Sequence, residues 1–403
     1  MTEFEEARRT ILESVAPAGV ERVQLLDSAG RILAADFLAP GDLPRVDKSA
    51  MDGFAVRSAD CLPGATLKVT GYLPAGSLPG DSVDTGCAIR IMTGAPIPPG
   101  ADAVVPLEAT ESSAVSVTLQ SPVERGMHIS HRGSDVQRGD RLVAAGALLG
   151  PPQIGLLASF GCAMIPVYRK LRVAIVSSGD ELVELGVEPR ANQLVNSNAF
   201  ALAAGVKLCG AEPVLLGIAR DTRESHRALL EEGLQADVVV TSAGVSAGDR
   251  DLVRETLASL GVKERFWKVA MRPGGATFFG MKDSVPVFSL PGNPGATMIA
   301  FEELVRPALL RMMGQQRVIR RKVRAYLKED VRKKAGVLVF LTVQAGWEQG
   351  NWQASTAGEA TTRRTSRQQY YNAVALLPAD RSTFAAGEAV DLHILDQTIE
   401  MEA

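Results

Sequence analysis

Three loops in the second half of the chain combine glycines, small hydroxyl side chains and carboxylates, each directly after a run of apolar residues. They occupy residues 177–182 (SSGDEL), 241–251 (TSAGVSAGDRD) and 291–296 (PGNPGA). In a parallel sheet such loops meet at the carboxyl edge, where the following helices point their positive N-termini. Backbone N–H groups there bind oxyanions, and carboxylates beside them bind a divalent cation. The pattern favours a site for a phosphate-bearing ligand and Mg²⁺.

The first loop offers a hydroxyl and an acidic group. Ser178 closes the apolar run LRVAIVSS, and Glu181 follows it three residues later. Glu181 is a candidate cation ligand, and Ser178 a candidate substrate contact. A serine followed at this spacing by a glutamate is also the pattern of an ordinary helix cap. The residues of this loop alone leave both interpretations open.

The second loop is the richest in backbone donors. Gly244 and Ser246 lie in a run whose spacing lets successive N–H groups curl into an anion-binding nest, and Asp251 would face that nest. Plain turns use the same residue types. This loop, however, follows a buried parallel strand and carries acidic residues at its rim. We therefore interpret it as a loop for phosphate and a divalent cation.

The third loop combines prolines, which favour the start of a helix, with a glycine, which lets a ligand approach the backbone. Its candidate substrate contacts are Pro291, Gly292, Asn293 and Pro294. Proline favours the first helical turn, and glycine lets a ligand come near the backbone, which suits an oxyanion. A rigid strand-to-helix turn is the alternative explanation of the prolines.

Cations and one more carboxylate lie near these loops in the sequence. Lys268 and Arg272, in the segment WKVAMRPG, are candidates to neutralise phosphates, with solvated surface cations as the alternative. Asp221 ends the apolar run EPVLLGIA, where it is either a site carboxylate or a helix N-cap.

The first half of the chain supplies three weaker candidates. Asp52 lies on an Asp-Gly turn, which by itself is hairpin chemistry. Thr93, in IMTGAP, and Asp135, in HRGSD, are similarly ambiguous.

The strands and helices expected from the sequence divide the chain into four regions, which position these residues. Residues 171–317 alternate apolar strands with amphipathic helices (197–208, 223–234, 252–260 and 294–313), which predicts an open parallel α/β sheet. Short runs of alternating apolar and polar residues over 48–141 predict the strands of an inserted β domain. It interrupts a discontinuous helical domain, 1–47 and 142–170, for which we expect helices over 4–15 and 28–37. The same alternation over residues 318–403 predicts a final small β domain.

The composition of the chain argues against several classes of protein. The chain has 403 residues and a formal net charge of -3, which argues against a dedicated nucleic-acid binder. Its four cysteines and four histidines show no zinc-site spacing. The start MTEFEEARRT lacks an apolar signal region, and no apolar run is long enough to span a membrane. We expect a cytoplasmic protein without a membrane or nucleic-acid partner.

Taken in order, the motifs resemble one family. SAMDGFAV, IMTGAPIPPGADAVV, HRGSD, SSGDEL, TSAGVSAGDRD, WKVAMRPG and LPGNP follow one another as in the MoeA family, the molybdenum insertases (molybdopterin molybdenumtransferases) of molybdenum cofactor biosynthesis. The resemblance runs nearly end to end. It implies an elongated homodimer with a discontinuous helical domain, an inserted β domain, a molybdopterin-binding α/β domain of the MogA type and a C-terminal β barrel.

The resemblance also implies an activity. The family takes adenylylated molybdopterin and molybdate, cleaves the phosphoanhydride in a Mg²⁺-dependent step and inserts the metal, releasing AMP. It further implies transient contacts with the molybdopterin adenylyltransferase and with apo-molybdoenzymes.

Residue by residue, the resemblance assigns Glu181 and Asp251 to Mg²⁺ and phosphate, with Asp221 in support. Lys268 and Arg272 match the cationic strand, and the loop from Pro291 to Pro294 matches the segment at the molybdate end. The three matching positions of the inserted domain, which would reach the site of the other subunit, are Asp52, Thr93 and Asp135.

The chain departs from the family pattern in three places. Gly295 and Ala296 stand where the family commonly has valine and serine, and Gly275 and Ala276 replace the lysine and proline of PGKP. A basic stretch follows near the C-terminus, and within it the candidates to replace lost oxyanion contacts are Arg363, Arg364, Ser366 and Arg367. Two alternatives follow: a molybdopterin-binding scaffold with reduced catalysis, or a tungstate-handling variant.

Overall fold

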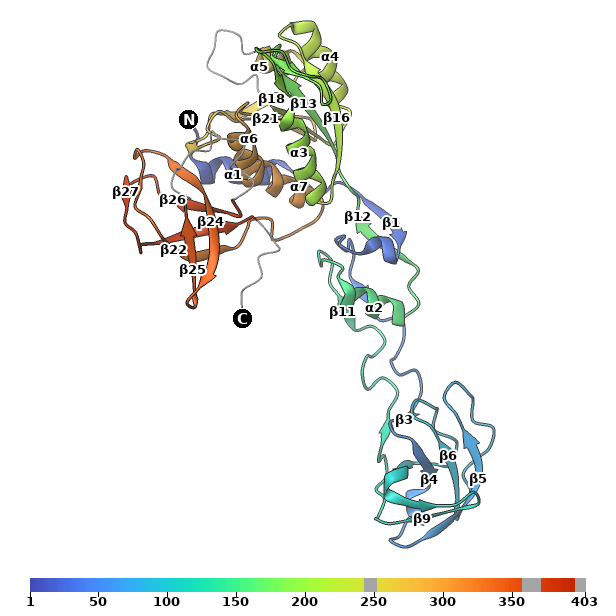
Figure 1. Cartoon of the computed structure of the whole chain (residues 1–403). Helices are drawn as coiled ribbons and strands as arrows, with labels where there is room; N and C mark the ends of the chain where they lie inside the picture. The colour runs from blue at the N-terminus through green and yellow to red at the C-terminus, as the bar shows by residue number, and fades with distance from the viewer. Residues whose placement is uncertain (243–251, 357–370, 396–403) are drawn as a thin grey trace. The chain divides into compact units, whose positions relative to one another are not determined.

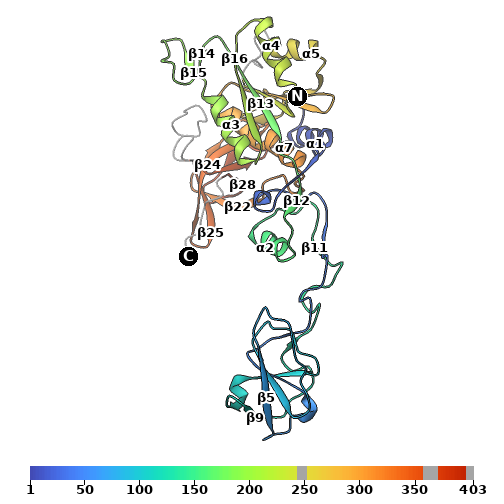
Figure 2. The ribbon, with the colours of Figure 1, turned by 90° about the vertical axis from the view of Figure 1, so that its right-hand side faces the viewer.

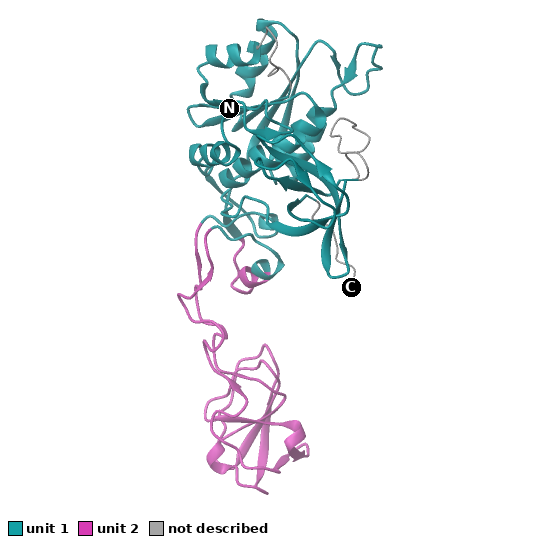
Figure 3. Ribbon diagram, turned by 90° about the vertical axis from the view of Figure 1, so that its left-hand side faces the viewer, with its two compact units in different colours: residues 1–34, 146–154, 164–403 teal, residues 35–145, 155–163 magenta. Residues whose placement is uncertain are grey.

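The computed structural model describes residues 1–242, 252–356 and 371–395 (Figure 1). The chain divides into two compact units, each built from separate stretches of sequence (Figure 3). Unit 1 contains Met1–Ala34, Gly146–Ile154 and Met164–Ala403, and unit 2 contains Ala35–Ala145 and Gly155–Ala163. In the described residues no helix is long and apolar enough to cross a membrane.

A six-stranded sheet forms the centre of unit 1. Its spatial order is β16 (Glu212–Ala219), β13 (Arg172–Ser178), β17 (Val238–Ser242), β21 (Val285–Leu290), β20 (Phe278–Lys282) and β18 (Lys263–Trp267). The first four strands are parallel, as the sequence predicts, and β13 is buried along nearly its whole length. Parallel strands with both faces covered are apolar on both faces, which explains the continuous runs of valine and isoleucine.

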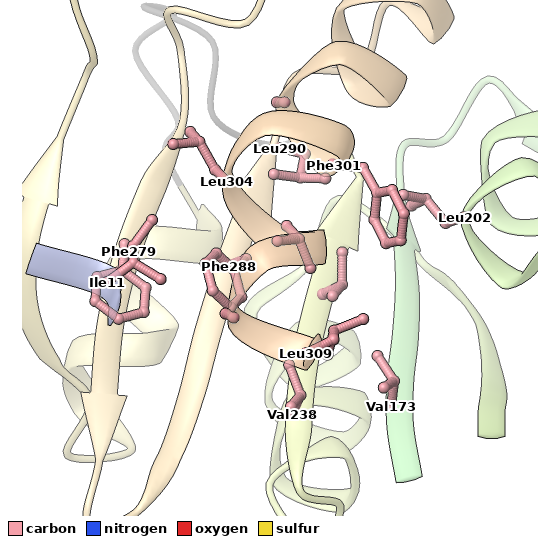
Figure 4. Packing of buried hydrophobic residues seen from close by; sticks show 14 of the residues in the cluster. Ile11, Val173, Leu202, Val238, Phe279, Phe288, Leu290, Phe301, Leu304 and Leu309 are labelled. Atoms are coloured by element: carbon pink, nitrogen blue, oxygen red, sulfur yellow. The ribbon is translucent and has the colours of Figure 1, made fainter. Parts of the chain in front are cut away.

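Helices cover both faces of this sheet. One face packs against α1 (Phe4–Ser14), α3 (Ser197–Leu208), α6 (Pro294–Ala300), a π-helical turn (Phe301–Val305) and α7 (Arg306–Met312). The other face packs against α4 (Arg223–Gly233) and α5 (Leu252–Ser259), which contact each other (Figures 1 and 2). Val238 and Val240 point into the first core and Val239 into the second, as the alternation of a strand requires. Figure 4 shows Phe288 and Phe301 within the first core.

Two predictions for this region are corrected. The sheet is not parallel throughout, because β20 and β21 are joined by a two-residue turn, and so short a connection forces antiparallel pairing. The helix expected over 294–313 is interrupted by the π-helical turn just before Pro307. Proline has no N–H to continue the α-helical ladder, so the helix adjusts there.

The C-terminal part of unit 1 is a closed five-stranded β barrel, which the family resemblance implies. Its strands are β24 (Leu338–Glu348), β25 (Asn351–Ser355), β22 (Lys322–Leu327), β28 (Ala389–Ile394) and β26 (Ala373–Leu377), and β26 closes on β24. A short strand, β19 (Met271–Arg272), pairs in parallel with β24 and joins the cationic segment to the barrel. A separate two-stranded ribbon pairs β23 (Val331–Arg332) with β27 (Thr383–Phe384).

The remaining elements of unit 1 include two short β ribbons and a single turn. Strand β1 (Val20–Gln24) pairs with β12 (Met164–Tyr168), and β14 (Leu182–Val183) pairs with β15 (Leu194–Val195). The helix expected over 28–37 is wrong, because Leu26–Ser28 form one 3-10 turn and Ile32 and Leu33 form β bridges instead. The glycine within this segment, Gly30, has a φ of +74° that helical geometry does not allow. Helix α2 (Pro151–Ser159) runs across the unit boundary.

Unit 2 is a β domain. Its six-stranded sheet has the order β7 (Ala103–Pro106), β4 (Gly53–Val56), β6 (Cys87–Ile91), β5 (Thr66–Leu73), β9 (Ser116–Leu119) and β8 (Thr110–Ser112). Two ribbons complete it, β3 (Lys48–Ser49) with β10 (Ile129–Ser130) and β2 (Phe37–Leu38) with β11 (Arg141–Val143). Two 3-10 turns, Ser58–Asp60 and Leu107–Ala109, lie between strands.

Candidate active site

The candidate residues of unit 1 gather at the carboxyl edge of the sheet. Strands β13, β17 and β21 lie in register, with Ser177 opposite Ser242 and Ser242 opposite Leu290. The three loops predicted from the sequence therefore begin at the same edge. The second loop, with Gly244, Ser246 and Asp251, lies outside the described residues, as do Arg363, Arg364, Ser366 and Arg367.

The first and third loops line one cavity of about 320 Å³. Glu181 contributes the carboxylate, Ser242 the hydroxyl at the end of β17, and Gly292 and Pro294 the third loop. The start of α3 contributes Asn198. This cavity brings together a carboxylate, hydroxyls and amides around the helix starts, which suits a polar ligand with anionic groups.

Asn198 connects the loops of this cavity, and the sequence analysis missed it. Its Nδ2 donates to Ser242 Oγ at 2.8 Å and to the Gly292 carbonyl oxygen at 2.8 Å. The same Nδ2 lies 3.3 Å from Thr297 Oγ1, so Asn198 joins the end of β17 to the third loop and to α6. The signal in the sequence was the polar run VNSN at the start of the helix, where Asn196 is the N-cap of α3.

The third loop is held rigidly as it enters α6. Asn293 caps the helix by accepting a hydrogen bond from Ala296 N, and Pro294 occupies the first turn. Thr297 Oγ1 lies 2.5 Å from the Pro291 carbonyl oxygen and 2.9 Å from that of Asn293. A loop fixed by its own backbone keeps its geometry when a ligand binds, which reduces the entropic cost of binding.

The same loop lines a second cavity, of about 670 Å³, on the side of the barrel. Asn293 and Ala296 come from the loop, and Arg272 from β19. The barrel side adds three more cations, Arg332, Lys333 and Lys334, which the sequence analysis did not single out. No aspartate or glutamate is among its lining residues in the described part of the chain. The cavity therefore attracts anions.

Lys333 is the cation of this cavity whose protonation is perturbed. Burial lowers the pKa of Lys333 below that of an ordinary lysine, and Asp380 opposes that shift. Its Nζ donates to the Val337 carbonyl oxygen at 3.2 Å. Removing water from a cation disfavours its charged form, so a bound anion would restore part of the lost stabilisation.

Lys268 lines neither of these cavities. Its ammonium group lies over the Trp267 ring, 4.1 Å from the centroid, and its φ is +70°. Its backbone carbonyl accepts a hydrogen bond from Thr2 N. Lys268 is therefore not among the cations of the second cavity, although it shares one short segment with Arg272.

Ser178 and Asp221 take part in the support of the first loop. Ser178 is 4% exposed, and its Oγ lies 2.9 Å from Nε2 of the buried His226. His226 Nδ1 lies 2.9 Å from the Thr222 carbonyl, so Nδ1 is assigned the proton and Nε2 accepts from Ser178. Asp221 N donates to Asp180 Oδ1 at 3.1 Å. His226 went unnoticed in the sequence because a single histidine on an amphipathic helix carries no signal.

In unit 2, Asp52 and Thr93 come together. Thr93 donates to Asp52 Oδ1 from both its backbone N and its Oγ1, each at 2.7 Å. These two hydrogen bonds, the backbone one first, lower the pKa of the Asp52 carboxyl. Gly53 permits this turn, because a Cβ there would lie 1.9 Å from the Val105 carbonyl oxygen. Asp135 is anchored elsewhere in unit 2, with its backbone N donating to the Leu43 carbonyl oxygen.

Glu181 fits one ligand position of a magnesium site. Its carboxylate folds back over Gly179, where a Cβ would lie 2.4 Å from Glu181 Oε2. Mg²⁺ in phosphoryl chemistry is commonly held by one or two carboxylates together with substrate phosphates. Within the described residues no group of three or more His, Cys, Asp or Glu side chains could hold a metal. Glu181 would therefore act with substrate oxygens.

Comparison with known proteins decides the family. Residues 2–161 match the MoeA N-terminal region (domain I and II), and residues 174–311 match a probable molybdopterin binding domain. The molybdopterin molybdenumtransferase of Haemophilus influenzae is 34% identical over 401 residues, 98% of each chain. The chain belongs to the MoeA family. It is an enzyme of molybdenum cofactor biosynthesis, a molybdopterin molybdenumtransferase.

Other relatives agree with this assignment to the MoeA family. The Staphylococcus aureus molybdopterin molybdenumtransferase is 32% identical over 398 residues, 97% of this chain and 95% of that protein. A crystal structure of a molybdopterin biosynthesis MoeA protein from Pyrococcus horikoshii superposes with a TM-score of 0.87 at 31% identity, covering 98% of this chain and 99% of that one.

Two departures from the MoeA pattern have a structural context. Ala296 lines the cationic cavity, so the hydroxyl common in the family is missing there. At Gly275 a Cβ would lie 2.8 Å from the Met271 carbonyl oxygen and 3.1 Å from that of Val269. The local backbone therefore has no room for a lysine at this position, and the cavity draws its positive charge from Arg272 and the barrel.

Proposed function

We propose that this MoeA-family enzyme takes adenylylated molybdopterin and molybdate, cleaves the phosphoanhydride in a Mg²⁺-dependent step and inserts the metal, releasing AMP. One observation carries the proposal. The third loop lines a cavity containing Glu181 and, with Asn293 and Ala296, a second cavity with four cations. A reaction between a phosphate-linked substrate and an oxyanion needs two such neighbouring cavities.

We assign the phosphate-linked substrate to the cavity of Glu181. Ser242 offers a hydroxyl, and Asn198 fixes the positions of the two loops around it. Glu181, with Asp251, would hold Mg²⁺, whose charge offsets that of the phosphates when bound. Because Asn198 holds Ser242 and the third loop in place before substrate arrives, the cost of arranging them is not incurred during the reaction.

We assign molybdate to the cationic cavity. Molybdate is a tetrahedral dianion, and the cavity is lined by Arg272, Arg332 and Lys333, with no carboxylate among its lining residues in the described part of the chain. Guanidinium groups bind oxyanions through two parallel hydrogen bonds. Asn293 and the α6 start lie where this cavity meets the third loop. Asp221, Ser178 and Lys268 remain predictions of the sequence, since each is engaged outside the two cavities.

We further propose a cytoplasmic homodimer whose site is shared between subunits. Asp52 and Thr93 form a preorganised acidic turn on unit 2. Together with Asp135, they would act on the α/β region of the other subunit. Transient contacts with the molybdopterin adenylyltransferase and apo-molybdoenzymes would deliver substrate and accept product.

The substitution Glu181→Gln tests the phosphate assignment. It removes the carboxylate charge with little change in shape, so AMP release should fall by about 100-fold or more while the melting temperature is unchanged. Glu188→Gln, on the exposed stretch after β14, is the matched control and should keep full activity. Unchanged AMP release in Glu181→Gln would contradict the assignment.

A carrier of molybdopterin with reduced catalysis is the second candidate, favoured by Ala296 in the cationic cavity. A carrier would bind molybdopterin tightly yet release no AMP with molybdate. A tungstate-handling variant would instead release AMP faster with tungstate than with molybdate.

A further inference from the structure

A groove of about 810 Å³ in unit 1 belongs to neither cavity of the candidate site. It lies between one side of α1 and the segment that links α7 to β22. On α1, its lining positions follow the spacing of a single helical face, from Glu5 through Leu12 to Glu13. The opposite face of α1, with Phe4 and Ile11, is buried in the core. The groove is thus built on a firmly anchored helix.

The groove is strongly basic in a chain that is acidic overall. Five arginines line it: Arg8, Arg9, Arg311, Arg317 and Arg321. Only two lining residues are acidic, whereas the whole chain has a formal charge of -3. Arg8 pairs with Glu5. The other four arginines are exposed and form no ion pair in the described part of the chain.

The remaining lining residues restrict what the groove can bind. They include Leu12, Val318 and Ile319, and Ile319 is 42% exposed. No aromatic side chain lines the groove within the described residues, so a nucleobase would find no stacking partner. No glycine is among its lining residues in the described part of the chain either, so no glycine-rich turn surrounds a single phosphate there. Separated guanidinium groups around an aliphatic floor suit several carboxylates interspersed with aliphatic side chains.

We propose that this groove binds an acidic, extended segment of a partner protein. Carboxylates of the segment pair with Arg9, Arg317 and Arg321, and an aliphatic side chain covers Ile319. The groove side of α1 from Glu5 to Glu13 is ~12 Å long at ~1.5 Å per residue, enough for about four extended peptide residues. The charge of the groove, opposite to that of such a segment, supplies both attraction and orientation.

Binding of a defined peptide to the full-length protein tests this proposal. The probe is a fluorescein-labelled eight-residue peptide of alternating glutamate and leucine, followed by fluorescence anisotropy, and the comparison peptide carries glutamine in place of glutamate. Arg9→Glu and Arg317→Glu are the test variants. Arg265→Glu, an exposed arginine on β18 with the same change of charge, is the control. Melting temperatures establish that all three variants fold.

The acidic peptide should bind the parent protein at least about tenfold more tightly than the glutamine peptide. Arg9→Glu and Arg317→Glu should each weaken it about tenfold, and Arg265→Glu by less than about twofold. Equal binding of both peptides, or equal weakening by Arg265→Glu, would overturn the proposal. Complete displacement by millimolar phosphate at constant ionic strength would show a small-anion site instead. Conversion of a dimer to a monomer by Arg317→Glu would show that a second copy fills the groove.

Discussion

Asn198 is the residue on which the geometry of the phosphate-side cavity most depends. Its amide joins Ser242 to the Gly292 carbonyl, and therefore joins two loops that are 50 residues apart in sequence. A hydrogen bond of this kind contributes ~1 kcal/mol to stability, but its larger effect is to keep the two loops at one separation. This makes Asn198 a positioning residue rather than a catalytic one.

Asn198→Ala should raise the KM for adenylylated molybdopterin about tenfold and lower stability by ~1 kcal/mol. A lost bond between loops weakens substrate binding more than it slows the bound substrate, so kcat should fall less than KM rises. Steady-state AMP release and thermal unfolding measure the two effects. Asn192→Ala removes an exposed asparagine of the same segment and should change neither. Equal kinetics for the two variants would show that Asn198 has no positioning role.

The lowered pKa of Lys333 predicts that the affinity for molybdate depends on pH. Because burial lowers the pKa of Lys333, it loses its proton at a lower pH than an ordinary lysine. Molybdate affinity should therefore decrease on the alkaline side, as pH rises through that lowered pKa. In Lys333→Arg the charge persists, so the alkaline limb should move to higher pH. If molybdate affinity decreases at the same alkaline pH in the parent protein and in Lys333→Arg, the titrating group is not Lys333.

At the scale of elements, the end of α7 fixes how the α/β region meets the short β1–β12 ribbon. Gly314 has a φ of +85°, and a Cβ there would lie 2.0 Å from Tyr168. Gly261, after α5, has the same φ with nothing within 4 Å of its added Cβ. The two glycines therefore separate the cost of backbone strain from the cost of a steric clash.

Gly261→Ala should destabilise the protein by about 1 kcal/mol, the cost of placing a side chain in the left-handed region. Gly314→Ala should cost roughly 2–4 kcal/mol, because overpacking against Tyr168 adds to the strain. Urea unfolding of the two variants measures the difference. Equal destabilisation would mean that Tyr168 moves aside without cost.

The sequence predicted those elements whose pattern is local. Helix α3 has the predicted bounds, Ser197–Leu208, because its apolar spacing and its cap agree. The parallel pairing of β13, β16 and β17 was predicted from their uninterrupted apolar runs. The antiparallel β18 and β20 were missed as a pair, because no short-range signal distinguishes a strand that reverses from one that follows a crossover. The helix expected over 28–37 is wrong because Gly30 adopts a left-handed backbone conformation, which the apolar spacing of the sequence does not reveal.

The candidate site was less predictable than the fold. The loops were visible because glycine, serine and acidic residues follow strands. The barrel cations Arg332 and Lys333 were not, since only the folding of a segment 60 residues away brings them to Arg272. Asn198 and His226 were missed for a related reason: each acts through a partner that is distant in sequence. Contacts of this kind are set by tertiary structure rather than by spacing.

At the scale of the whole molecule, the proposal requires Asp52 of one subunit to act with Glu181 of the other. Asp52→Ala and Glu181→Ala are each expected to be inactive. Mixed and allowed to exchange subunits, they should recover about a quarter of the parent activity, since half the dimers are mixed and each has one intact site. Light scattering gives the oligomeric state in the same samples. Mixing without recovery, in a sample that demonstrably exchanges subunits, would place both residues in one subunit's site.

The most direct test of the central claim is AMP release by the full-length protein from adenylylated molybdopterin with Mg²⁺, measured with and without molybdate. Recovery of activity in an acceptor apo-molybdoenzyme is followed in the same reaction. The proposed activity predicts AMP release that depends on both molybdate and Mg²⁺ and is matched by recovered cofactor. Tight binding of adenylylated molybdopterin with no molybdate-dependent release of AMP would contradict it.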